Sequence, residues 1–317
     1  MKNDFEIAAE QIILEKQEKF VYGASKSDIR PDVKEKHKQA VISFDGGEVS
    51  FSKETGLMTS YIVNGKEMLN TAPAAGIKGI IPSLYRAPID NDRNIAPNWN
   101  KNGLDKYETS CVLFELKGSG SNIIVRTVQS IVVKNKELCS IKLDYTISGD
   151  GAVEISQEML SSKKLHKEPP RFGFTVELAS DLRNAEYYGL GEKENLPDFR
   201  AQSSLGVYSA KIEDMHEDYI KPQENGNHYH CRKASVGNGT NGVTAFAATS
   251  FDFSVSNYSD YELAVKKHNY ELEESDFVTM HLDYKNSGVG SNSCGPQLLP
   301  QYQMNDKEFE WEYQLKF

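Results

Sequence analysis

The pattern of hydrophobic and polar positions changes near Ala40, where short alternating runs separated by turns begin. A Gly46-Gly47 pair divides the first two runs, and Asn64-Gly65 divides a later pair. Period-two alternation indicates half-buried strands, and Asn-Gly between two such runs is a strong signal for a two-residue hairpin. The pattern therefore predicts antiparallel strand pairs from this point on.

The same pattern continues to the C-terminus. Apolar and aromatic runs of strand length predict strands at 110–116, 122–133, 138–147, 152–160, 172–178, 207–212, 243–249, 251–255 and 277–284. The clearest alternation ends the chain, where Phe309, Trp311, Tyr313, Leu315 and Phe317 alternate with polar residues. Many strands joined by turns, with few helical signals, predict an all-β fold, a large antiparallel sandwich.

Three segments have a different character. Residues 5–15 combine Ala, Glu, Gln and Leu with Ile, so propensity alone favours a helix there. Residues 16–39 are rich in Lys, Glu, Asp and Ser with few apolar anchors, a composition typical of a linker. Ser259 and Glu262 have the spacing of a capping box, which predicts a short helix running to about His268.

Composition narrows the classes of partner. Sixteen Tyr and fourteen Phe strengthen the preference for sheet. The formal net charge of -10 disfavours nucleic acid and anionic membrane surfaces, because the field of the chain repels polyanions. No run approaches the roughly 18 consecutive apolar residues that a membrane span needs. Neutral ligands and proteins remain as partners.

Four cysteines, Cys111, Cys139, Cys231 and Cys294, are widely separated and form no CxxC pair. They are typical of reduced thiols. Because the N-terminus also lacks the segments of a secretory signal, we expect a cytoplasmic protein.

Arg86 to Asp92 is the first stretch that could carry chemistry. Asp90 and Asp92 have Asp-x-Asp spacing, but the further ligands of a calcium loop are missing. We therefore favour a turn stabilised by short polar side chains and an Arg86 ion pair.

Two Glu-Asn pairs, Glu194-Asn195 and Glu224-Asn225, stand in polar loops. The first follows a Gly-x-Gly, but the third glycine of a nucleotide fingerprint is absent and Pro197 prevents the helix that should follow. Paired carboxylates about 5 to 5.5 Å apart serve retaining glycosidases. Whether these two glutamates meet is left open by the sequence.

His228 and His230 would share one face of a strand and offer two metal ligands. No second ligand pair stands at zinc-site spacing, so we favour a structural or pH-titrating histidine pair and predict no metal site. No serine has the context of a nucleophile elbow.

The polar, glycine-rich stretch from Asn286 to Pro296 cannot pack a core, because it consists of small hydrogen-bonding residues and one thiol. A surface connection between strands and a functional loop are both consistent with it.

Five stretches are informative together: RAPIDND at 86–92, YGLGEKENLPD at 188–198, YIKPQENG at 219–226, FSVSNYS at 253–259 and GVGSNSCGP at 288–296. In this order they resemble the C-terminal domain of long-chain β-galactosidases of glycoside hydrolase family 2. The resemblance covers about residue 40 to the end. The chain as a whole resembles the separate small subunit found in two-gene β-galactosidases.

The resemblance implies a galactose mutarotase-like supersandwich that completes the galactoside site of a (β/α)8 barrel on a large subunit. It places the catalytic glutamates of the retaining reaction, and the Mg²⁺ and Na⁺ sites, on that partner. This chain is then expected to be inactive alone and to bind no cofactor. The resemblance also implies a structural role, not a catalytic one, for seven motif residues: Arg86, Asp90, Asp92, Glu194, Asn195, Glu224 and Asn225.

The resemblance also assigns roles to segments. Residues Arg93, Asn94, Ile95 and Ala96 match a mobile active-site loop, and Asn292, Ser293 and Cys294 match a loop that enters the sugar site, where many relatives have Trp. It replaces the N-terminal helix by a strand. We expect residues 1–15 to add a strand to a partner domain, 16–39 to form a charged linker, and 40–317 to form the sandwich.

The expected function is thus hydrolysis and transgalactosylation of terminal β-D-galactosides such as lactose, by a heterodimer. Two alternatives stay open. One is an aldose 1-epimerase-like enzyme that acts alone, and the other is a carbohydrate-binding module.

Overall fold

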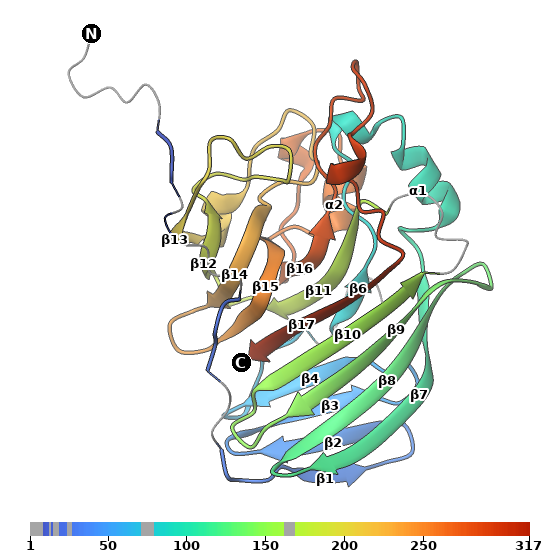
Figure 1. Ribbon diagram of the computed structural model, residues 1–317, viewed down its shortest axis with the longest axis vertical. Coiled ribbons are helices and arrows are strands. Elements are labelled where there is room, and N and C mark those ends of the chain that lie inside the picture. Colours follow the sequence, from blue (N-terminus) through green and yellow to red (C-terminus); the bar gives the residue numbers. More distant parts are fainter. Residues whose placement is uncertain (1–8, 13, 15–18, 24–26, 71–78, 162–168) are drawn as a thin grey trace.

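The computed structural model describes residues 9–12, 14, 19–23, 27–70, 79–161 and 169–317, and in this part the chain is an antiparallel all-β protein with short helices (Figure 1). The prediction of an all-β sandwich is confirmed. In the described part every strand pairing is antiparallel.

The smaller sheet is a meander of β1 (Asp32–Glu35), β2 (Gln39–Phe44), β3 (Gly47–Ser52), β4 (Met58–Val63) and β5 (Lys66–Glu67). Asn64 and Gly65 connect β4 to β5 with φ of 49° and 79°. Positive φ at both central residues is what the predicted Asn-Gly hairpin turn requires.

The larger sheet runs in the order β13-β12-β14-β15-β17-β10-β9-β8-β7. Its strands are β7 (Glu108–Ser119), β8 (Asn122–Val133), β9 (Lys136–Ile147), β10 (Val153–Ser161), β12 (Asn184–Gly191), β13 (Ser204–Lys211), β14 (His228–Gly237), β15 (Gly242–Ser256) and β17 (Glu308–Lys316). A side branch adds β16 (Phe277–Asn286), β11 (Arg171–Ala179) and β6 (Ile81–Ser83), with β16 paired to β15.

The core fills the space between the two sheets. In Figure 1, β1–β4 lie below β7–β10, and the longest loops gather at the opposite end of the molecule. Phe51 of β3 meets Tyr145 of β9 with ring centroids 5.0 Å apart, and Tyr61 of β4 stacks on Phe317 at 4.0 Å. Burying each such side chain contributes about 1.5 to 3 kcal/mol.

Strand β17 has the predicted alternation, with Phe309, Trp311, Tyr313 and Leu315 buried. It lies between β15 and β10 and pairs with both. The last strand of the chain thus joins the two halves of the larger sheet.

Several strand predictions need correction. The two strands predicted at 243–249 and 251–255 form one continuous strand, β15. Its register with β14 shifts at two points. Strands β6, β12 and β14 are absent from the strands listed in the sequence prediction, because their glycine, proline and charged residues obscure the alternation.

The helices are α1 (Ala96–Asn102) and α2 (Asp260–Val265), with 3-10 turns at Asp90–Asp92, Ile212–Met215, Asn269–Glu271 and Pro300–Tyr302. Ser259 caps α2 as predicted, since its Oγ accepts from the Glu262 amide at 3.2 Å. The Glu262 carboxylate instead accepts from the Glu273 amide, and the helix ends at Val265, before His268.

The predicted linker at 16–39 is wrong at its C-terminal end, because Asp32–Glu35 is strand β1 and pairs with β2. Part of the rest docks on the larger sheet: the Phe20 amide donates to the Ala248 carbonyl at 2.7 Å, and Tyr22 stacks on Phe246 at 5.8 Å. Apolar rings within a charged segment provide these anchors.

The strand expected for the N-terminal segment stays a prediction. Residues 9–12 and 14 form no strand within this chain, and residues 1–8, 13 and 15 lie outside the described part. The Gln11 side chain contacts the edge strand β13, where it accepts from the Leu205 amide at 2.7 Å and donates to its carbonyl at 3.0 Å.

Candidate functional site

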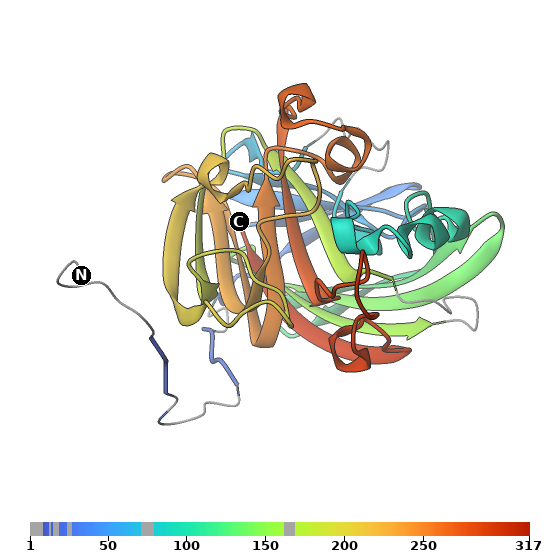
Figure 2. The same ribbon diagram turned by 90° about the horizontal axis from the view of Figure 1, so that it is seen from above.

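The motif stretches converge at the loop end of the larger sheet. The segment after β16, the Arg86 to Ile95 segment before α1, and the loops that follow β12 and precede β14 all lie there (Figures 1 and 2). We call residues 286–296 the site loop. Hydrogen bonds from the other loops fix it in place, as the following contacts show.

Arg86 is the central anchor of the site loop. Its Nε and Nη2 donate to the Asp92 carboxylate at 3.1 and 3.0 Å, so the ion pair is bidentate and buried. Its Nη1 and Nη2 also donate to Asn286 Oδ1, the Ser287 carbonyl and the Gly288 carbonyl at 3.1, 2.7 and 3.2 Å. The predicted Arg86 ion pair is present, and it joins two segments about 200 residues apart.

Asn91 and Asn94 hold the outer part of the site loop. Asn91 Nδ2 donates to the Gly290 carbonyl at 2.7 Å, and Asn91 Oδ1 accepts from Ser293 Oγ at 2.6 Å. Asn94 Nδ2 donates to the Asn292 carbonyl at 2.6 Å. Of the three predicted contact residues, Asn292 and Ser293 therefore have supporting bonds, and Cys294 is exposed beside them with a free thiol.

Asp198 clamps the base of the same loop. Its two carboxylate oxygens accept from the Val289 and Gly290 amides, both at 2.8 Å. Gly290 has φ of +64°, a backbone conformation that L side chains rarely adopt. This clamp joins the YGLGEKENLPD stretch to the GVGSNSCGP stretch.

The segment predicted as a mobile loop runs from a 3-10 turn into helix α1, and its mobility stays a prediction. Arg93 follows the 3-10 turn at Asp90–Asp92, Ile95 is the N-cap of α1, and Ala96 is its first residue and is buried. Pro97 near the helix start supplies a φ that suits a first turn. Arg93 and Asn94 are exposed, so only this part of the predicted loop faces outward.

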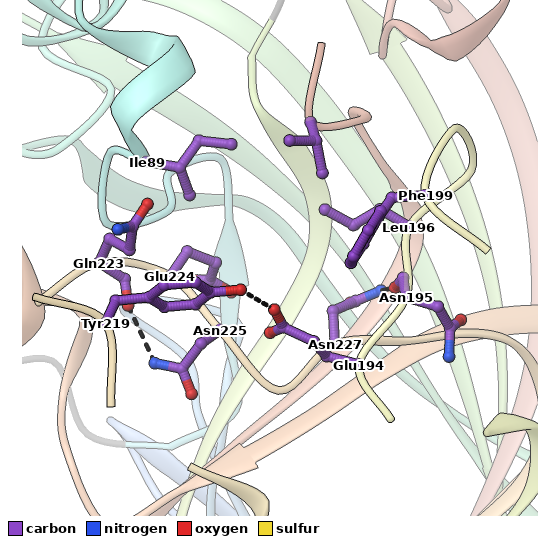
Figure 3. Close-up of a pocket in the computed structure, with 11 residues that line it drawn as sticks. Ile89, Glu194, Asn195, Leu196, Phe199, Tyr219, Gln223, Glu224, Asn225 and Asn227 are labelled. Carbon is purple, nitrogen blue, oxygen red and sulfur yellow. Dashed lines mark hydrogen bonds between the residues drawn. The ribbon is translucent and has the colours of Figure 1, made fainter. Parts of the chain in front are cut away.

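Glu194 and Glu224 line one cavity, which the sequence left open (Figure 3). Glu194 accepts from the Tyr219 hydroxyl and from the Gly226 amide. Burial raises the pKa of Glu194 above its ordinary value. The asparagines that follow the two glutamates hold nearby backbone in place. Asn195 Oδ1 accepts from the Tyr229 amide at 2.7 Å, and Asn225 Oδ1 accepts from the Glu217 amide at 3.1 Å.

A buried charge cluster lies below the site loop. Arg171 pairs with Glu224 and, at 3.5 Å, with Asp283. Burial raises the pKa of Asp283 to about 6 and raises that of neighbouring Asp252 well above its ordinary value. Asp252 Oδ2 accepts from the Asn286 amide at 3.1 Å, so this cluster also supports the start of the site loop.

The two predicted histidines lie in different environments. His228 is buried and stacks on Tyr187 with ring centroids 4.0 Å apart. His230 is only partly buried and has φ of 64° at an irregularity of β14, which interrupts the regular alternation of the strand. Among the described residues, no group of three or more His, Cys, Asp or Glu could hold a metal ion.

The sequence reasoning gave no role to Asn91, Asp198, Tyr219, Gln223 or Asn286. Four of them lie inside the quoted motifs, so a signal was present. Gln223 Oε1, for example, accepts from the Asp90 amide at 3.0 Å and so ties the YIKPQENG loop to the RAPIDND turn. What the motifs could not reveal was which loop each side chain would reach.

No helix in the described part of the chain is long and apolar enough to cross a membrane.

Among solved structures, the chain is similar to galactose 1-epimerase from Lactobacillus acidophilus NCFM, with a TM-score of 0.45 and 10% identity over 91% of this chain and 98% of that chain.

Sequence comparison gives a closer likeness. The chain is 36% identical over 74% of its length to a β-galactosidase of Actinobacillus pleuropneumoniae, of which this covers 23%. It is 27% identical over 88% of its length to a β-galactosidase of Alteromonas mediterranea, of which this covers 27%. The chain thus spans about a quarter of the length of the curated relatives that it matches.

The family model described as beta galactosidase small chain matches residues 44–316, which is nearly the whole sandwich. All the loops that hold the site loop fall within this range. The chain therefore belongs to the β-galactosidase small chain family.

Proposed function

We propose that this chain is the small subunit of a heterodimeric β-galactosidase and that it completes the active site on a large subunit. The substrates are terminal β-D-galactosides such as lactose, and the reactions are hydrolysis and transgalactosylation. The family match over residues 44–316 is the observation that carries the proposal. The β-galactosidases that the chain resembles are about three times as long as this chain, so they have room for a catalytic part that the match does not cover.

In this proposal the large subunit supplies the chemistry. A (β/α)8 barrel carries the two glutamates of a retaining mechanism, in which paired carboxyls act as nucleophile and as acid/base. The Mg²⁺ and Na⁺ sites also belong to the large subunit. This chain supplies no bond-breaking group, because Glu194 and Glu224 are engaged with Tyr219, Gly226 and Arg171.

The small subunit contributes a pre-formed loop. The contacts of Arg86, Asn91 and Asp198 fix the backbone of the site loop before any sugar binds. A fixed loop loses little conformational entropy on binding, and it excludes water from the partner's site. Cys294 is the exposed side chain at its tip and the proposed sugar contact, with Ser293 and Asn292 beside it.

Arg93, Asn94, Ile95 and Ala96 form the second proposed wall of the sugar site. Asn94 reaches the site loop directly, whereas Ile95 and Ala96 begin α1. We propose that Arg93 faces the partner, since it is exposed next to the site loop. We also propose a cytoplasmic location, which the four free thiols support.

Reconstitution tests the proposal. The purified chain is expected to be inactive toward a nitrophenyl β-galactoside, and turnover is expected when the large subunit is added. Hydrolysis by the isolated chain at a rate typical of the assembled enzyme would contradict the proposal. Polarimetry with fresh α-galactose serves as a parallel assay, because mutarotation by the chain alone would favour an epimerase.

A further inference from the structure

A cavity of about 90 Å³ lies between the YGLGEKENLPD and YIKPQENG loops (Figure 3). One side of it is apolar and the other polar. The apolar side consists of Ile89, Leu196, Phe199 and Val289. The polar side consists of Glu194, Asn195, Tyr219, Gln223, Glu224, Asn225 and Asn227.

The cavity leads from the surface to a buried floor. Phe199 and Tyr219 are 45% and 38% exposed, whereas Glu224 and Asn227 are 8% and 3% exposed. A small ligand could therefore enter between the two rings and reach polar groups that solvent barely touches. Figure 3 shows the Phe199 ring and the Glu194 and Tyr219 side chains facing the same central space.

Most polar side chains around the cavity are already used by the protein. Asn227 Nδ2 donates to the Asn195 carbonyl at 2.9 Å, and Gln223 Nε2 donates to the Lys221 carbonyl at 3.2 Å. Glu224 differs, because only its Oε1 accepts a hydrogen bond, from Arg171. Within the described ranges its Oε2 has no donor, although the residue is more than nine-tenths buried.

The unused acceptor of Glu224 indicates which kind of ligand would fit the cavity. Carboxylates only accept hydrogen bonds, so a matching ligand must donate them. Arg171 compensates the charge of Glu224, and burial raises the pKa of Glu194, so the cavity favours a neutral donor over a cation. The Phe199 ring offers an apolar face. A pyranose, with hydroxyl donors around an apolar ring face, has this combination.

The location of the cavity connects it to the site loop. Val289 belongs to the site loop and Ile89 to the RAPIDND turn, and both form its apolar side. Asp198, which clamps Val289, is the neighbour of Phe199 in the chain. A sugar in the cavity would therefore lie directly beside the loop that is proposed to reach the galactose site.

We propose that this cavity is a saccharide subsite that takes one edge of the second sugar of an oligosaccharide galactoside. A sugar hydroxyl donates to Glu224 Oε2, and the sugar ring packs against Phe199. The assignment of the ligand as the sugar next to galactose rests on the proposed function.

Phe199→Ala tests this subsite with little risk to the fold. Phe199 is half-exposed, and its backbone bonds with Leu196, at 3.0 and 2.9 Å, do not depend on the ring. In the assembled enzyme, the ratio of kcat/KM for lactose to kcat/KM for a nitrophenyl galactoside is expected to fall about 5- to 10-fold. Phe199→Tyr, which keeps the ring, is expected to restore the ratio.

Tyr270→Ala is the matched control, because Tyr270 is also an exposed aromatic residue but lies outside the cavity. It should leave the ratio unchanged. An unchanged ratio in Phe199→Ala would overturn the subsite, whereas a wild-type complex that hydrolyses neither substrate would contradict the proposed function instead.

A second measurement keeps the subsite testable in that case. Ligand-observed NMR of the isolated full chain with glucose and lactose is expected to show saturation transfer that Phe199→Ala reduces. Equal signals for the wild type and Phe199→Ala, or no signal for the wild type, would overturn the subsite without reference to catalysis.

Discussion

At the residue scale, Arg86 has the largest set of contacts at the site. It is buried, pairs with Asp92 and donates to the first residues of the site loop. The sequence motif predicted the ion pair but not the loop contacts, because the acceptors lie about 200 residues away. The spacing of residues within one motif cannot predict a hydrogen-bond partner so far away in the sequence.

Arg86→Ala is therefore expected to lower the free energy of unfolding by about 3 to 5 kcal/mol, because it leaves the Asp92 charge buried and unpaired. Urea unfolding measures the loss. Arg126→Ala is the control, since Arg126 pairs with Asp144 on the surface and should cost less than about 1 kcal/mol. Equal losses in the two variants would contradict the role of Arg86.

Cys294→Trp tests the proposed sugar contact. The side chain is exposed at the site loop, so the exchange should leave thermal stability nearly unchanged. In the assembled enzyme it should change KM for galactosides, because an indole stacks on a sugar face and a thiol cannot. Kinetics on the complex and thermal melting of the chain are the measurements. Identical sugar kinetics would remove Cys294 from the site.

His228 gives a pH-dependent prediction. Burial lowers its pKa from 6.5 to about 4, so the unfolded chain binds more protons between these values and stability rises with pH there. Asp283 opposes this, because its raised pKa makes stability fall as pH rises from about 4 to 6. The two groups therefore act in opposite directions over nearly the same range.

His228→Phe keeps a ring against Tyr187 and removes the first contribution. Between pH 4 and 6.5 the free energy of unfolding of the variant should rise less with pH than that of the wild type. Denaturant unfolding at several pH values measures this. Parallel curves for the two proteins would show that His228 does not titrate as described.

At the scale of elements, the site loop depends on a clamp from another loop. Asp198→Ala removes the acceptor of the Val289 and Gly290 amides, so both should exchange their hydrogens faster in amide exchange experiments. Asp306→Ala, which removes only a surface pair with Lys285, is the control. Unchanged exchange at Val289 and Gly290 would mean that other contacts suffice.

Helix α1 shows what the sequence reasoning missed at this scale. Residues 93–98 contain Asn and Pro, which suggest a loop, yet Pro97 lies where a helix begins and Gly103, with φ of +74°, ends it. Trp99 is buried on the side of α1 that faces Arg86, whose guanidinium lies 5.9 Å from the ring. Burial of this one aromatic residue favours a helix in a segment whose other residues are mostly polar.

At the scale of the whole molecule, the fold class, most strands and the terminal alternation could be predicted, because burial on one face imposes period two on the sequence. The order of the strands could not. Nothing in the alternation of residues 308–317 shows that β17 lies between β10 and β15. The convergence of the motif loops is likewise a result of topology.

The position of β17 leads to a prediction about truncation. Removing residues 308–317 leaves β10 unpaired on one side and opens the adjoining edge of β15, and open edges promote aggregation. The truncated chain should aggregate on size-exclusion chromatography and lose near-UV circular dichroism. Removing residues 1–15 should leave both unchanged. A monomeric, native-like truncated chain would contradict the central role of β17.

The same arrangement has a consequence during synthesis. A ribosome completes β10 well before β17, because about 150 residues separate the two strands, and making them takes on the order of ten seconds. Until β17 emerges, β10 has one open edge, and open edges are prone to pair with other strands. The two halves of the larger sheet can therefore join only late in synthesis, and the nascent chain exposes a strand edge for many seconds.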